Sequence, residues 1–118
     1  MKTKMIIKVI SSSGEPYDVH FEFSDNKFTV FCNCPAGIYG KLCKHKTSLL
    51  ARDQSLLFDK ADEEKLELLH EVVKKSKYVE IISSYKIIKQ EIEEAQKKEK
   101  KAREQIEHAL KSGIEIVQ

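Results

Sequence analysis

Residues 31–45 of this chain read FCNCPAGIYGKLCKH, and this stretch decides the fold. It holds all three cysteines of the 118 residues, and it ends on a histidine. Three thiolates and one imidazole are a standard closed ligand set for zinc, which prefers four sulfur or nitrogen donors in a tetrahedron. The spacing therefore predicts one structural Zn²⁺ ion, held by Cys32, Cys34, Cys43 and His45.

Local backbone geometry allows these four side chains to meet. Side chains alternate along an extended segment, so Cys32 and Cys34 point to one face of a strand. Residues two apart on a helix point to nearly opposite sides, so we expect Cys43 just outside a helix and His45 in its first turn. The free N–H groups at the helix start would then stabilise the thiolates. Three alternatives stay open: unrelated buried cysteines, a disulfide with a spare thiol, and a Cys-x-Cys redox pair.

The pattern Cys-x-Cys-Pro, a short loop, and Cys-x-His before an apolar helix resembles the SWIM zinc finger family. FCNCP at 31–35 and GKLCKH at 40–45 carry the resemblance, which extends over about residues 17–51. The chain departs from the family at Lys46, because an apolar residue commonly follows the histidine there. The resemblance implies a module that contacts DNA or a protein, of the kind found inside transposases, helicase-like ATPases, kinases and recombination factors.

The positive charge of the chain gathers near the ligands. The formal net charge is only +2, too small to indicate nucleic-acid binding by itself. Residues 1–58 hold eight Lys and Arg against five Asp and Glu, whereas residues 59–118 hold thirteen against fourteen. A short window without acidic residues contains four basic candidates for contact with nucleic acid: Lys41, Lys44, Lys46 and Arg52. These side chains either contact phosphates or are solvated and balance the negative metal centre.

The residues before the ligands predict three strands. Apolar side chains occupy alternate positions in each of them: Met5, Ile7 and Val9, then Tyr17, Val19, Phe21 and Phe23, then Phe28, Val30 and Cys32. Asp25 and Asn26 suit a two-residue hairpin turn, and His20 falls on a polar face. The third strand thus delivers Cys32 on its core side. We expect Ile38 and Tyr39, at the tip of the loop before Cys43, to pack over the metal, with exposure to a partner as the alternative.

The fold class that follows is α+β, with a small antiparallel β-sheet and a zinc-stapled β-β-α finger, then a mainly helical, coiled-coil-like C-terminal half. A short helix from Cys43 to about Asp53 would place Leu49 and Leu50 on the sheet. We expect the finger and its strands to occupy residues 1–58 and a helical segment for oligomerisation or docking to occupy residues 59–118. An apolar content of 41% supports only a modest core, so metal binding coupled to folding suits this chain.

The second half has no Gly or Pro between Asp59 and Gly113, and so it reads as helical. Asp59 or Asp62 can cap a first helix with one apolar face, formed by Leu66, Leu69 and Val73. A longer helix begins near Tyr78, with Gly113 as its C-cap. Its heptad seam holds Tyr78, Tyr85, Ile92, Glu99 and Ile106 at one position, and Ile81, Ile88, Ala95, Ala102 and Ala109 at the other. That seam needs a partner: the preceding helix, a second copy in a homodimer, or another protein; a single charged helix is the alternative.

These patterns favour a binding module over an enzyme. Four good ligands leave no open coordination position, and no catalytic triad, phosphate-binding glycine loop or carboxylate pair stands out. His70 and His108 occur singly and are expected to be structural or exposed. We therefore expect an intracellular protein, in the cytoplasm or nucleoplasm, that binds DNA or a protein. We expect it to bind no small-molecule substrate and no membrane. The alternative is a structural protein whose helices bind partners and whose finger is only a folding staple.

Overall fold

The computed structural model describes residues 2–117 and divides the chain into two compact units, Met1–Val79 and Glu80–Gln118. This division differs from the expected one after residue 58. The difference arises because the helix that follows residue 58, Glu63–Val73, packs into the core of the first unit.

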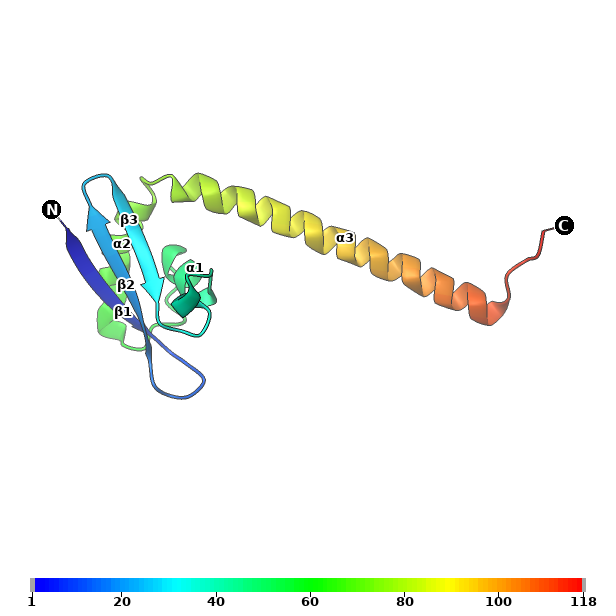
Figure 1. Cartoon of the computed structure of the whole chain (residues 1–118), viewed down its shortest axis with the longest axis horizontal. Coiled ribbons are helices and arrows are strands. Elements are labelled where there is room, and N and C mark those ends of the chain that lie inside the picture. Colours follow the sequence, from blue (N-terminus) through cyan, green and yellow to red (C-terminus); the bar gives the residue numbers. More distant parts are fainter. Residues whose placement is uncertain (1, 118) are drawn as a thin grey trace. The chain divides into compact units, whose positions relative to one another are not determined.

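In the described residues, three antiparallel strands form the sheet of the first unit, in the order β1-β2-β3 (Figure 1). They are β1 (Thr3–Val9), β2 (Tyr17–Ser24) and β3 (Lys27–Cys32). The two-residue turn at 25–26 joins β2 to β3, as predicted. In the register, Ile7 lies opposite Val19 and Val19 opposite Cys32, so the first ligand continues a row of inward apolar side chains. The period-two pattern therefore predicted both the strands and the face that they bury.

Two helices cover this face of the sheet: α1 (Lys44–Leu50) and α2 (Glu63–Val73). Leu49 is 1% exposed and Leu50 is 8% exposed, which confirms that α1 packs on the sheet. Leu66 and Leu69 of α2 are fully buried in the same cluster. Among the described residues, the buried members of the core are Ile7, Val9, Val19, Phe21, Cys32, Cys34, Leu49, Leu50, Leu66, Leu69 and Val73. The α+β class is thus as expected, but α2 belongs to the core that contains the cysteines.

The segment that leads to α2 covers the outer edge of β1 at the strand's C-terminal end, where Val9 and Leu57 form an isolated bridge. Asp59 accepts a hydrogen bond from the Ala61 N–H and so caps the short 3-10 turn η2 (Lys60–Asp62), directly before α2. Asp62 is 8% exposed; it accepts the Lys8 N–H at 3.3 Å and pairs with the Lys65 ammonium at 3.2 Å. A buried carboxylate with two such partners is satisfied, and it fixes α2 against the strand.

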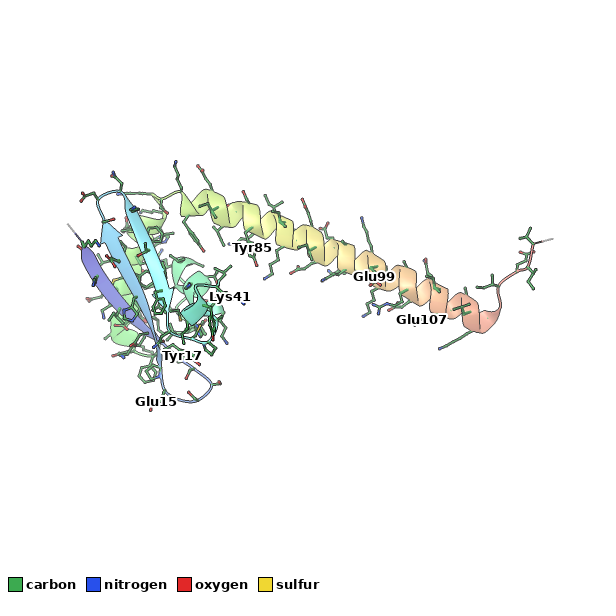
Figure 2. The ribbon with its side chains drawn as sticks, in the orientation of Figure 1. Glu15, Tyr17, Lys41, Tyr85, Glu99 and Glu107 are labelled. Carbon is green, nitrogen blue, oxygen red and sulfur yellow. The ribbon has the colours of Figure 1, made fainter. Side chains whose placement is uncertain are left out.

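The long helix α3 (Tyr78–Ser112) has 35 residues, all of them described, and none is buried. Gly113 follows it with φ +106°, and its N–H donates to the Ala109 carbonyl, as expected for a C-cap. Figure 2 shows the side chains of Tyr85, Glu99 and Glu107 standing on the surface of α3. The helix was predicted. Tyr78 at its start packs against the core of the first unit, whereas the seam residues from Ile81 to Ile106 are exposed. Between residues 2 and 117, no helix is long and apolar enough to cross a membrane.

Candidate metal centre

The four predicted ligands come together where the sheet meets α1. Cys32 is the last residue of β3 and points into the core, and Cys34 follows it after one residue. Cys43 is the N-cap of α1, with extended φ −133° and ψ 160°, and His45 lies in the first turn. Both positions at the helix start are as predicted. The ligand atoms of all four residues lie within 4.8 Å of one another.

The spacing of these atoms fits a tetrahedral ion. Zn–S bonds of about 2.3 Å and Zn–N bonds of about 2.0–2.1 Å place tetrahedral donors ~3.6 Å apart for sulfur to nitrogen and ~3.8 Å apart for two sulfurs. The Cys32 Sγ lies 3.8 Å from the His45 Nδ1, close to this value. The donor set, three thiols and one imidazole, is the one that zinc prefers. The arrangement is therefore compatible with one zinc ion, which would be held through the Nδ1 atom of His45.

Gly37 closes the loop between the second and third ligands. It begins the 3-10 turn η1 (Gly37–Tyr39), and its backbone N–H donates to the Cys34 Sγ at 3.3 Å. A Cβ atom built on Gly37 would lie 2.1 Å from the Cys32 carbonyl oxygen, so only glycine fits this close against the backbone of Cys32. The N–H donor to sulfur thus comes from this loop, whereas the Cys43 side chain makes no capping hydrogen bond to α1. The sequence predicts a turn in this loop, but nothing in its pattern singles out Gly37.

The cysteines and the histidine differ in how burial and hydrogen bonds set their pKa values. Burial raises the pKa of the Cys32 thiol to about 12. Burial acts in the same direction on Cys34, but hydrogen bonds from the Gly37 N–H and from the neighbouring thiols outweigh it and lower the pKa. Burial, and then the charge of Lys44, lower the pKa of His45, so its imidazole is neutral near pH 7. A neutral imidazole and a thiol with a lowered pKa are suited to bind a cation, and Cys32 would exchange its proton for the metal.

Lys46, the residue at which the chain departs from the SWIM pattern, is 8% exposed. Its aliphatic stem occupies the apolar position, and its Nζ reaches back to donate to the Lys41 carbonyl at 3.1 Å. A lysine therefore serves at this place by burying its methylene groups and satisfying its ammonium group on the ligand loop. The departure does not prevent α1 from packing.

The four basic candidates for nucleic-acid contact have different environments. Lys41 and Lys44 are exposed. Lys46 is buried with its ammonium group on the Lys41 carbonyl, and Arg52 forms a two-pronged ion pair with Glu67 of α2, with N–O distances of 2.9 and 2.7 Å. Both Lys46 and Arg52 thus have partners within the first unit.

The loop tip is exposed, so the expectation that it packs over the metal is wrong. Ile38 is 57% exposed and Tyr39 is 79% exposed. The physical reason is that the backbone of Gly37 already fills the space beside Cys32, and the 3-10 turn directs the next two side chains outward. Leu42, at 54% exposure, extends this apolar surface toward Cys43.

No protein-family model matches the chain, and no curated protein or solved structure shows significant similarity to it.

Proposed function

We propose that this chain is a zinc-binding interaction module of the SWIM type. The observation that carries the proposal is the cluster of Cys32, Cys34, Cys43 and His45, with ligand atoms within 4.8 Å. Four protein ligands satisfy a tetrahedral zinc ion and leave no position for a reactive water, so the metal has a structural role and the module is not an enzyme. The resemblance of residues 31–45 to the SWIM pattern supplies the type.

The exposed surface beside the ligands favours a protein as the partner. Ile38, Tyr39 and Leu42 present three large apolar side chains on the loop that the metal would close. Protein interfaces are enriched in aromatic side chains of this kind, particularly tyrosine. A DNA-binding surface would instead need several available cations, and Lys46 and Arg52 are occupied within the first unit.

Metal analysis tests the core of this proposal. The purified chain should hold one zinc ion, and His45→Asn should lose it together with the fold of the first unit. His20→Asn is the matched control, because His20 is exposed on the other face of the sheet. A chain purified without added chelator that holds no stoichiometric zinc, or a His45→Asn variant that keeps it, would refute the metal site.

Electrophoretic mobility of DNA at two salt concentrations distinguishes the two kinds of partner. Phosphate contacts make affinity fall steeply as salt rises. With a protein as partner, we expect no salt-dependent shift of either duplex or single-stranded DNA. A shift that weakens with salt and is lost in Lys41→Glu and Lys44→Glu, the two exposed basic residues, would establish DNA as the partner instead.

The second candidate is a structural protein that associates through its helices, with the finger as a folding staple. The specific observation is α3, in which none of the 35 residues is buried although its seam is apolar. Sedimentation equilibrium of the full zinc-loaded chain tests this candidate. If the chain is a monomer at every concentration, self-association is not part of its function.

A further inference from the structure

From Ile81 to Ile106 the seam of α3 is mostly apolar and exposed. Ile81 is 66% exposed, Ile88 is 55% exposed and Ile92 is 52% exposed, all on one side of the helix. The preceding helix α2 buries Leu66, Leu69 and Val73 in the core of the first unit, so this face of α2 is not free to pair with the seam. We therefore consider a second copy or another protein as the partner.

The seam residues are sorted by size along α3. The first half carries large side chains, Ile81, Tyr85, Ile88 and Ile92, and the second half carries mostly small ones, Ala95, Ala102 and Ala109. In a parallel pair each residue meets its own copy, so tyrosine would face tyrosine and alanine would face alanine. Helices paired in this way would need two different separations along one interface. When one copy is reversed, the half of the seam with large side chains faces the half with mostly small ones, so the two helices can pack at one separation.

We propose that α3 pairs with α3 of a second copy of this chain in an antiparallel arrangement, with the two-fold axis between Glu93 and Glu94. In this single register every seam residue from Ile81 to Ile106 faces a seam residue of the other copy. The facing pairs, each present twice by symmetry, are Ile81 with Ile106, Tyr85 with Ala102, Ile88 with Glu99, and Ile92 with Ala95. The overlap is about 39 Å long at about 1.5 Å per residue.

Glu99 is the one charged residue in this seam, and the structure shows how it is accommodated. Its carboxylate pairs with Arg103, one turn further along the same helix, at 3.2 Å. The aliphatic part of Glu99 can then lie against Ile88 of the second copy while the charge stays at the edge. In a parallel pair the two Glu99 side chains would face each other across the seam, which like charges disfavour.

The charges that flank the seam also distinguish the two orientations. In the antiparallel register Glu91 lies beside Lys98 of the second copy, an attractive pair that occurs twice. In a parallel pair Lys98 would lie beside Arg103 of the second copy, a repulsive pair that also occurs twice. Both the sizes and the charges of the side chains thus select the reversed copy as the occupant.

This inference rests on the second candidate function, association through the helices, and adds the partner and its orientation. Sedimentation equilibrium of the full zinc-loaded chain tests it with Lys98→Glu. In the antiparallel dimer this change places two glutamates beside each other at both sites, so the dissociation constant should rise roughly tenfold. The double variant Glu91→Lys with Lys98→Glu restores opposite charges and should restore the affinity. Lys97→Glu, the same charge change on the outer face of α3, is the matched control and should leave the affinity unchanged.

Each other outcome overturns the proposal. If Lys98→Glu tightens the dimer, the helices are parallel, since the new glutamate would then attract Arg103. If the parent chain stays monomeric, the seam does not pair with a second copy. Zinc content measured on the same samples separates these results from a failure of the metal site, because α3 contributes no ligand.

Discussion

Replacing Gly37 with alanine should weaken zinc binding although Gly37 is not a ligand. The added Cβ would lie 2.1 Å from the Cys32 carbonyl oxygen and 2.8 Å from its carbonyl carbon. Real Cβ atoms stay beyond 3.0 Å, so the loop or the end of β3 must retreat by the difference from 2.1 Å, at least 0.9 Å. Both neighbours are backbone atoms, so no side-chain rotation relieves the clash.

A shift of this size is large for a metal site, in which ligand distances vary by about 0.2 Å. It would also break the hydrogen bond from the Gly37 N–H to the Cys34 Sγ, 3.3 Å long in the structure. Overpacking of this kind costs about 1–3 kcal/mol, and about 1.4 kcal/mol corresponds to a tenfold change in an equilibrium constant. We therefore expect Gly37→Ala to weaken zinc affinity by about 10- to 100-fold, the range seen when groups that position metal ligands are changed.

Competition with a chromogenic chelator measures this affinity directly. The control is Gly40→Asn, in the same loop. A Cβ at Gly40 meets nothing within 4 Å, and its left-handed backbone, with φ +72°, is one that asparagine tolerates. Its affinity should stay within about threefold of the parent, a change of under 1 kcal/mol. If Gly37→Ala binds zinc as tightly as Gly40→Asn does, the close approach between the loop and Cys32 does not shape the site.

Three further outcomes are expected. Leu69→Ala should lower the free energy of unfolding by about 2–5 kcal/mol in chemical denaturation, because Leu69 is fully buried. Leu68 is 65% exposed, so Leu68→Ala should change this free energy by less than about 0.5 kcal/mol. Equal effects of the two variants would show that α2 does not pack into the core. Lys46→Ala should lower the free energy of unfolding by about 2 kcal/mol in the same measurement, because it removes buried methylene groups. Lys44 is exposed, so Lys44→Ala should leave the free energy of unfolding almost unchanged. If Lys46→Ala also has no effect, the aliphatic stem of Lys46 does not pack in the first unit. Zinc affinity should rise at least tenfold per pH unit between pH 6.5 and 8 in chelator competition. The reason is that the pKa of Cys32 is about 12, so its thiol must release a proton when the metal binds. An affinity that does not change with pH would contradict this proton release.

The ligand set and the elements that deliver it could be predicted because both follow from local rules. Alternation along β3 placed Cys32 on the core side, and it is fully buried. The side-chain directions of a helix placed Cys43 at the N-cap and His45 in the first turn, as the structure has them. Rules of this kind depend only on neighbours in the sequence, so a single chain is sufficient to apply them.

The division into units could not be predicted, because it depends on contacts between distant residues. The change to a sequence without Gly or Pro after residue 58 indicated a new helical segment, and the spacing of Leu66 and Leu69 indicated an apolar face. Neither pattern says what that face covers. A three-stranded sheet leaves more apolar surface than the seven residues of α1 can shield, and this imbalance was the available signal that α2 belongs with the strands.

The interior position of the ligands changes what the metal stabilises. Cys32 and Cys34 belong to the same buried cluster as Leu66 of α2, so the metal site is a part of the hydrophobic core. Without the ion, Cys32 would be protonated, and the coordination bonds that would join β3 to α1 would be missing. Because Leu66 packs on the sheet that the ion would fix, we expect loss of the metal to destabilise α2 as well, although α2 contributes no ligand. Metal binding and the packing of α2 are therefore expected to stabilise the first unit as one cooperative structure.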